Sequence, residues 1–561
     1  MNKTFRGLLS AVVCFALLTT SAGSSVIADG EVQHQDLYQL VDARHDPSLK
    51  NSHYRVWADD FSIVTAVTFI HMTQNSENDK SSTQGFICSS LTDSVCAPKS
   101  ENLTALVQSV LGICESPTEI GCIESLSYKN SVLALEGLAS VSPPKTIRNE
   151  DIQLGIPRGS TMSLWEASDG TRYVVAAVVQ SSTRTSKQSK VAMPSWEKAD
   201  SNLSLSIRRV KRDYVIPEGR AIISIDSPGR EGQPTLGVQG GNVFPTLDFM
   251  PGTFFKFGVR VPSNVSGFFR GRIANAIVET SSSTPSSSTY VIQGDISPVY
   301  IAGAEASLDD SSSPAYREPP GFHRSMSMSS ATSLGDYTRW KTYIGDRALT
   351  TRTYWQALTS DSNEQRCFES SKKINGLVAS NSAFYSSSAP VFNATTGTFD
   401  YKVASPHFDE SGNVAVGKYS LSIPLSVLQC LYGSDVIPGT AEISFTYADG
   451  SPTQTLQQSV TVAGDWANVS VSGLHFSSPI IRTKFAVPYR TRLSKRESIS
   501  LRSVYRTKAS QRPKWTAVGS CKISGSRLVA SGRKGTCKVT LRVLNSKKRH
   551  VVSLRRSFKV S

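Results

Sequence analysis

The chain has 561 residues and a formal net charge of +15. After the N-terminal stretch, no apolar run approaches the about 20 residues of a membrane span, which excludes a transmembrane helix in the mature chain. The charge is uneven: residues 481–561 hold 23 Lys or Arg and one acid, Glu497, a local charge of +22, whereas residues 29–480 sum to −9. A weakly acidic body with a strongly basic end indicates an anionic partner for that end, and it names no reaction.

The first 28 residues have the three-part layout of a secretory signal peptide. Lys3 and Arg6 precede an apolar stretch over 7–18, and the small residues Val26 and Ala28 come just before Asp29. A signal anchor and an N-terminal core helix are the alternatives, but this stretch is too short to span a membrane. We therefore predict a secreted protein, extracellular and associated with the cell wall or cell surface.

Eight cysteines follow the signal segment, and an even number in an exported chain favours disulfides. The spacing favours the pairs Cys88–Cys96, Cys114–Cys122, Cys521–Cys537 and Cys367–Cys430, with crosswise pairing of the first four left open. A metal cluster is the rival interpretation. No C-x-x-C spacing occurs and no histidine lies near the early group in chain order, so we expect neither a metal nor a cofactor.

Most of the remaining chain has the pattern of short strands. Runs rich in Val, Ile, Phe and Tyr are separated by turn residues, at 56–71, 171–179, 221–226 and 254–261. Helical periodicity predicts helices only at 102–111 and at 424–431, the second with Pro424 in its first turn. Many strands with few helices predict a mostly β, multi-domain protein built from antiparallel, sandwich-like domains.

Composition divides the chain into five parts. The Ser/Pro tract at 281–288 precedes another strand-like run, so we interpret it as a mobile strand-to-strand loop, whereas the longer tract at 306–334 has no apolar period and is typical of a linker. The predicted parts are the signal peptide at 1–28, an N-terminal β-rich region with local disulfides at 29–305, the linker at 306–334, a second β-rich domain at 335–477, and a basic module at 478–561.

The basic module has a strand with two different faces. Val539, Leu541 and Val543 alternate with Lys538, Thr540 and Arg542, as in a half-buried strand whose cations project into solvent. A Cys521–Cys537 disulfide would add roughly 3 kcal/mol of stability by limiting the unfolded chain.

These residues carry a resemblance to a known family. The pattern W…G-x-C-x-I-x-G…L-x-A…G-x-C-x-V resembles bacterial immunoglobulin-like modules of exported cell-surface proteins, found especially in Gram-positive actinobacteria; its positions here are Trp515, Cys521, Gly525, Leu528, Ala530, Gly535 and Cys537. The resemblance covers about 80 residues of the chain. It implies a small β-sandwich with Trp515 packed near the cystine, used in adhesion or as a spacer. The rest of the chain resembles secreted proteins to which we attach no activity.

The concentration of charge predicts where an anion would bind. Like charges folded into one small module repel one another, and a polyanion relieves that repulsion. For an exported protein the nearest polyanions are cell-wall or envelope polymers, and of the nucleic acids only extracellular DNA is available, not intracellular nucleic acid. The alternative is a solvated basic surface, for which the acidic body acts as an internal counter-partner. The candidate anion-binding residues are Arg490, Arg492, Lys495, Arg496, Arg533, Lys534, Lys547, Lys548, Arg549, Arg555 and Arg556.

Two local groups have the residue types of a catalytic site. Residues 412–419, GNVAVGKY, match a phosphate-binding loop except that Tyr419 replaces the Ser or Thr, so we interpret them as a glycine-bounded turn. His407, Asp409 and Glu410 lie together, but no nucleophile motif accompanies them and a polar turn explains them. We predict a structural or adhesive cell-surface protein without catalytic residues; the alternative is a secreted hydrolase of wall or extracellular polymer that the basic module targets.

Overall fold

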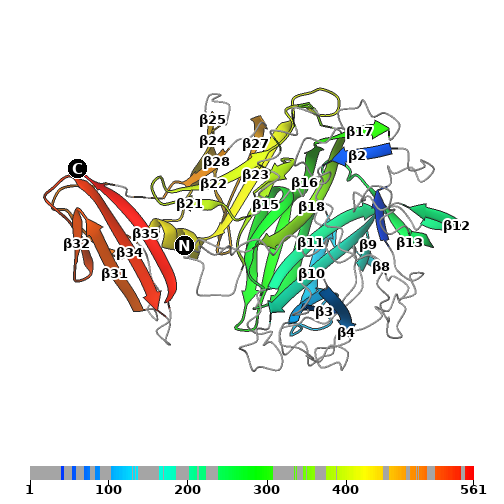
Figure 1. Ribbon diagram of the computed structural model, residues 1–561, viewed down its shortest axis with the longest axis horizontal. Helices are drawn as coiled ribbons and strands as arrows, with labels where there is room; N and C mark the ends of the chain where they lie inside the picture. Colours follow the sequence, from blue (N-terminus) through cyan, green and yellow to red (C-terminus); the bar gives the residue numbers. More distant parts are fainter. Residues whose placement is uncertain are drawn as a thin grey trace.

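The computed structural model describes the backbone at 39–42, 53–57, 69–75, 83–88, 103–128, 131–136 except 133, 163–184 except 168–169, 201–210, 214–222, 238–307 except 264, 345–348, 350–360, 374–446 except 387, 454–475, 480–487, 492–501, 512–544 and 550–561, and at the single positions 334, 337, 341, 489 and 504. Of the elements whose bounds are given, 35 are strands and α3 is the helix (Figure 1). Most pairings are antiparallel, so the predicted mostly β class is confirmed. No helix in these ranges is long and apolar enough to cross a membrane.

A network of 20 hydrogen-bonded strands runs through the body of the molecule. Its first ten strands are β1 (Gln39–Asp42), β3 (Phe69–Asn75), β4 (Thr83–Cys88), β5 (Leu103–Val110), β6 (Cys122–Tyr128), β7 (Ser131–Val132), β8 (Ala134–Glu136), β9 (Ser163–Glu166), β10 (Arg172–Arg184) and β11 (Ser201–Val210). The others are β12 (Tyr214–Ile222), β13 (Val238–Leu247), β14 (Phe254–Pro262), β15 (Gly267–Ser283), β16 (Ser287–Ile301), β18 (Thr350–Ser360), β19 (Ile374–Ser380), β23 (Val416–Pro424), β26 (Thr461–Ala463) and β27 (Trp466–His475). A separate pair joins β2 (His53–Trp57) to β17 (Gly303–Ser307).

The prediction of a helix at 102–111 is wrong. The segment forms β5, which pairs with β3 on one side and β10 on the other. Ladder hydrogen bonds to two neighbours outweigh a weak local helical preference. The tract at 281–288 connects two strands as predicted, but the loop is shorter than predicted, because only 284–286 lie between β15 and β16. The Thr284 amide donates to the Ser287 carbonyl (2.7 Å) and closes this hairpin.

Strand β15 belongs to two parts of the network. Its first half pairs with β18 and β19 and its second half with β16, and the register shifts between Ala274 and Ile277, around Asn275 with φ of 52°. A bulge of this kind bends and twists a strand, so that it can serve two sheets.

The division expected at 306–334 therefore needs correction. Strands β11, β15 and β16, which precede this segment, pair with β18 or β19, which follow it. Trp355, Leu377 and Trp466 lie in the same buried cluster as Phe255 and Leu205. The regions 29–305 and 335–477 thus share a sheet and a core. A polar, proline-rich tract can connect two strands of one core as readily as two domains.

A six-stranded sheet covers the other side of β19, β23 and β27, and a second core lies between the two layers. Its strands are β20 (Phe384–Tyr385), β21 (Val391–Asn393), β22 (Thr398–Ala404), β24 (Thr440–Thr446), β25 (Gln454–Ser459) and β28 (Ile480–Phe485). Helix α3 (Leu425–Tyr432) follows Pro424 and ends at Gly433, whose φ of 66° suits glycine, so the short helix predicted at 424–431 is confirmed.

The C-terminal module is a sandwich of two sheets at one end of the molecule (Figure 1). One sheet holds β29 (Arg492–Leu493), β31 (Arg512–Gly519), β34 (Gly535–Leu544) and β35 (His550–Val560), and the other holds β30 (Ser498–Ser500), β32 (Cys521–Ser524) and β33 (Arg527–Ala530). The module begins later than the predicted residue 478, because β28 pairs with β22 and β24 and buries Ile481 and Phe485 in the body. The positively charged part of the sequence therefore begins before the folded module does.

The described disulfides agree with the predicted pairs. Cys114 bonds to Cys122, and Cys521 in β32 bonds to Cys537 in β34, which ties the two sheets of the module together. Cys430 is also disulfide-bonded, to a cysteine outside the described residues, so its pairing with Cys367 stays a prediction. The side chains of Cys88 and Cys96 also lie outside the described residues.

Candidate anion-binding surface

The alternation of strand residues turns one set of cations outward on the four-stranded sheet of the module. In β34, Cys537, Val539 and Leu541 are buried, and the residues between them face out. The neighbouring strands are in matching register, so their outward residues continue the same surface. We call this surface the cationic face; its exposed cations are Arg492, Lys514, Lys538, Arg542 and Lys559.

Two cation pairs lie directly opposite each other on neighbouring strands. Lys514 of β31 is in register with Arg542 of β34, and Arg492 of β29 is in register with Lys559 of β35. Lys538 lies between these two ends, opposite Val518 and Ser557. Like charges directly opposite each other across a sheet are destabilising. The cost is comparable in size to the stabilisation by a favourable cross-strand pair, about 0.2–1 kcal/mol.

Hydroxyl groups occupy the positions between the cations. Thr516 is in register with Thr540, and Thr536 is in register with Lys559. The face has no Asp or Glu among its described residues. Ammonium, guanidinium and hydroxyl groups all donate hydrogen bonds, so the face presents donors to an anion and offers no carboxylate as an internal counter-ion.

The single acid of the module lies in a turn of the opposite layer. Glu497 accepts a hydrogen bond from the Ser494 amide (2.7 Å) in the turn between β29 and β30. The outer side of the three-stranded sheet carries Lys522 and Arg527. Arg527 is used locally, since its Nε donates to the Ser498 hydroxyl and its Nη2 to the Ser498 carbonyl, both at 2.7 Å. Positive charge is therefore concentrated on the four-stranded side.

Two turns at one end of the module add a second group of cations. Arg496, with φ of 62°, donates its amide to the Ser531 carbonyl (3.2 Å), which joins the turn before β30 to the turn before β34. The same end holds Ser561, the residue after β35, because the Lys495 amide donates to the Ser561 carbonyl (3.3 Å). The exposed cations of these turns, here called the turn cluster, are Lys495, Arg496, Arg533 and Lys534.

The candidates from the sequence fall into three groups. Arg492, Lys495, Arg496, Arg533 and Lys534 are exposed as an anion site requires. The residues Arg490, Lys547, Lys548 and Arg549 lie outside the described residues, and for Arg555 the structure gives only a backbone position opposite Thr540.

Arg556 is a correction to the predicted set. Only 2% of it is exposed, its Nη1 donates to the Val504 carbonyl (2.8 Å), and its guanidinium lies 4.1 Å from the centre of the Tyr489 ring. It alternates with Arg555 along β35 and therefore points to the inner side of the sheet. The candidate list also missed Lys514, Lys538, Arg542 and Lys559, although the alternating pattern around Cys537 already placed Lys538 and Arg542 on the solvent side.

The histidine and the two acids near residue 408 point to different places. The imidazole of His407 contacts Asp346, which also forms an ion pair with Lys341 (2.8 Å). Glu410 accepts a hydrogen bond from Thr351. These contacts join the loop of His407 and Glu410 to Asp346 and to strand β18, and Asp409 and Glu410 do not converge with His407 on one centre.

Asp409 serves the turn that carries it. Slight burial raises the pKa of its carboxyl, but hydrogen bonds from Asn413 and from the backbone amides of Ser411 and Gly412 outweigh that effect and lower the pKa below its usual value. Gly412 has φ of 87° and ends a turn, as predicted, but the turn does not extend to 419, because strand β23 begins at Val416.

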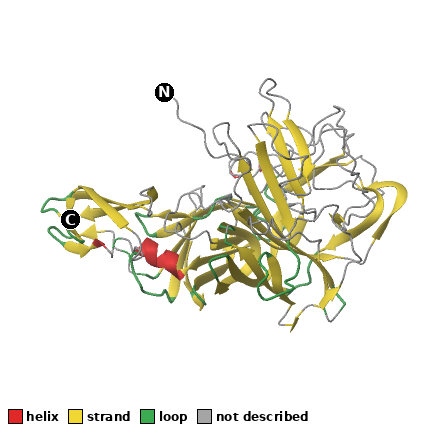
Figure 2. Cartoon of the chain, turned by 90° about the horizontal axis from the view of Figure 1, so that it is seen from below, coloured by secondary structure: helices red, strands yellow, loops and turns green. Residues whose placement is uncertain are grey.

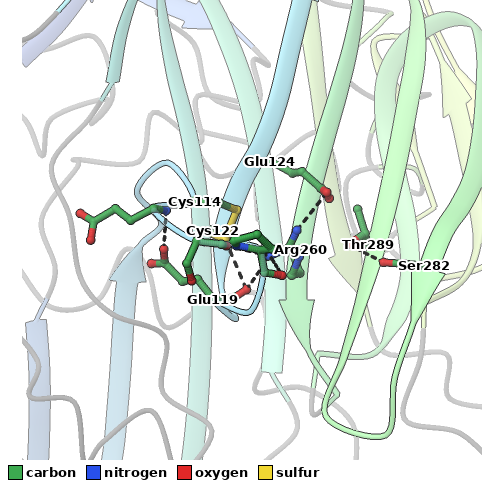
Figure 3. A network of polar contacts seen from close by, with 10 residues as sticks. Cys114, Glu119, Cys122, Glu124, Arg260, Ser282 and Thr289 are labelled. Carbon is green, nitrogen blue, oxygen red and sulfur yellow. Dashed lines mark hydrogen bonds and ion pairs between the residues drawn. A yellow bond between two sulfur atoms is a disulfide. The ribbon is translucent and has the colours of Figure 1, made fainter.

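A second organised polar site surrounds the Cys114–Cys122 disulfide (Figure 3). The guanidinium of Arg260 donates from Nη1 to the carbonyls of Ser116 (3.2 Å), Pro117 (2.7 Å) and Glu119 (3.0 Å), and from Nη2 to Glu124 (2.9 Å). One side chain of β14 thus holds the whole disulfide loop. The donors and acceptors satisfy one another, so this network is structural.

Among the described residues, no group of three or more His, Cys, Asp or Glu is arranged to hold a metal ion.

In comparisons with known proteins, no family model, curated protein or solved structure matches the chain. In the described part of the chain, the cationic face is the arrangement with the clearest chemistry.

Proposed function

We propose that the chain is a secreted cell-surface protein with a structural or adhesive role, whose basic C-terminal module associates with anionic polymers of the cell envelope. One observation carries the proposal: the cationic face keeps like charges opposite each other on neighbouring strands and has no carboxylate among its described residues. Repulsion within that face falls when a polyanion binds, because the anionic groups then replace water and mobile ions as counter-charges.

The signal-like N-terminus supports an extracellular place of action, and envelope polymers are the polyanions nearest to a protein exported there. The resemblance of the module to bacterial immunoglobulin-like modules supports a role in adhesion or spacing. The body, with its acidic net charge, is then the part that the module holds at the surface.

The test is retention of the full chain on purified cell wall at low and high salt. One variant, K514Q/K538Q/R542Q/K559Q, removes four cations from the cationic face. Its matched control, K256Q/K402Q/K484Q/K522Q, removes four partly or fully exposed lysines from other surfaces. The two variants therefore have the same net charge.

We expect the unaltered chain and the control to sediment with wall at low salt and to be released at high salt. The variant of the cationic face should stay in solution under both conditions. Equal retention of the two variants would reject the face as the binding surface, and retention that does not respond to salt would reject electrostatic association altogether.

A further inference from the structure

The cations of the cationic face are arranged along a line. The Lys514–Arg542 pair marks one end of β34, and Thr536, in register with Lys559, marks the other. Six residues of strand separate these ends, which is about 20 Å at 3.3–3.4 Å per residue. Lys538 and the hydroxyl of Thr540 lie between them, and Arg492 completes the second end beside Lys559.

We infer that this face binds one segment of a linear phosphate-bearing polymer laid along β34 and held by a cation pair at each end. The inference rests on the proposed function and adds the ligand class and its mode of binding. A single small anion can reach one pair only, because the two pairs are too far apart to share it. A polymer reaches both, and its second contact benefits from an effective concentration in the millimolar range.

The outward residues favour a polymer over a membrane. Surfaces that bind lipid usually insert apolar or aromatic side chains below the headgroups. The apolar side chain turned outward among the described residues of the face is that of Val518, 68% exposed, while Trp515 faces the core. Threonine hydroxyls fill the intervening positions, and these can donate to phosphate oxygens as they do in nucleic-acid complexes.

The experiment measures binding of the full chain to inorganic phosphate, tripolyphosphate and long-chain polyphosphate across a range of salt concentrations. We expect affinity per phosphate group to rise by at least about 100-fold from the shortest to the longest ligand, the lower end of what a second linked contact provides. The end-pair variants K514Q/R542Q and R492Q/K559Q should each remove most of this rise. The control K402Q/K522Q should keep it, and the melting temperature of each variant checks its fold.

The salt dependence gives a second readout. With long polyphosphate, log K falls with log salt, and each lost phosphate contact makes that fall less steep by about 0.7, as for single-stranded nucleic acid. Removing either end pair should therefore make the slope less negative by about 1.4. Equal affinity per phosphate for all lengths, or one end pair carrying the whole effect, overturns the inference. Binding to phosphatidylglycerol vesicles as tight as that to long polyphosphate also overturns it.

Failure here is distinguishable from failure of the proposed function. Wall retention that depends on the cationic face, combined with binding that is independent of polymer length, would reject only the two-ended mode. Absence of both wall retention and polyphosphate binding would reject the function as well.

Discussion

Arg556 joins the basic module to the body, and replacing it should loosen that junction. Its guanidinium donates to the Val504 carbonyl within the module and stacks on Tyr489, whose hydroxyl donates to the Ala394 carbonyl of the body (2.7 Å). Cys430 of α3 packs against the module core at the same junction. Figure 2 shows this helix, in red, beside the C-terminal module. Arg556 is buried, so solvent does not screen these contacts.

The expected magnitude follows from the lost contacts. A hydrogen bond from a charged group contributes about 1.5–3 kcal/mol, and a desolvated cation–π contact about 2 kcal/mol. Because contacts of one side chain are not additive, Arg556→Ala should destabilise the module by about 3–4 kcal/mol, including the packing that the stem of the side chain provides. Arg556→Met restores much of the side-chain volume without a charge, so it should destabilise the module less than Arg556→Ala.

Hydrogen exchange of the full chain, followed by mass spectrometry, is the assay because it reports on β34 and β35 separately from the body. A loss of about 3 kcal/mol corresponds to exchange faster by about 100-fold in these strands. Arg542→Ala, an exposed position on the neighbouring strand, is the control and should change exchange little. Exchange in Arg556→Ala that equals the control would refute the argument that this buried cation supports the module.

Three further predictions concern the core, the disulfide and pH. Gly397→Ala should lower the unfolding free energy by more than about 2 kcal/mol in urea titrations, since φ is 74° and the new Cβ would lie 2.6 Å from Cδ1 of Tyr489; Gly439→Ala, where the space is open, is the control. Replacing Cys521 and Cys537 by Ser should lower the unfolding free energy by about 3 kcal/mol. Added reductant should then have little further effect on the stability of the module. Burial raises the pKa values of Tyr419 and Tyr432 in the folded chain, so the unfolded chain loses these protons first, from about pH 10, and stability should fall as pH rises further; phenolate absorbance that appears well before unfolding would contradict this.

Local patterns in the sequence predicted the elements that local forces determine. Helix α3 was predicted from local helical periodicity with Pro424 in its first turn, and the Cys521–Cys537 pairing was predicted from the spacing of the cysteines. The segment 103–110 was predicted wrongly because its pairing partners, β3 and β10, lie elsewhere in the chain. Long-range strand pairing, which also crosses the tract at 306–334, leaves no mark in composition.

The candidate site was predicted in its charge but not in its geometry. Runs of adjacent cations drew attention to Arg555 and Arg556, yet neighbours in a strand face opposite sides, and Arg556 is buried. Lys514 and Arg542 are far apart in sequence, and only the register of β31 with β34 brings them together. A face made by several strands can be recognised from sequence only when the pairing is known.

The arrangement of the cations, more than their number, separates binding from mere solubility. A soluble surface requires only net charge, and mixed signs across neighbouring strands would provide solvation while stabilising the sheet. Here the neighbours Lys514 and Arg542, and Arg492 and Lys559, repel one another instead. The acidic body does not resolve this repulsion, because the face remains exposed in the folded chain. Binding of an external anion would relieve this repulsion. Neutralising either cation pair should therefore stabilise the free module slightly and weaken its binding to the anion.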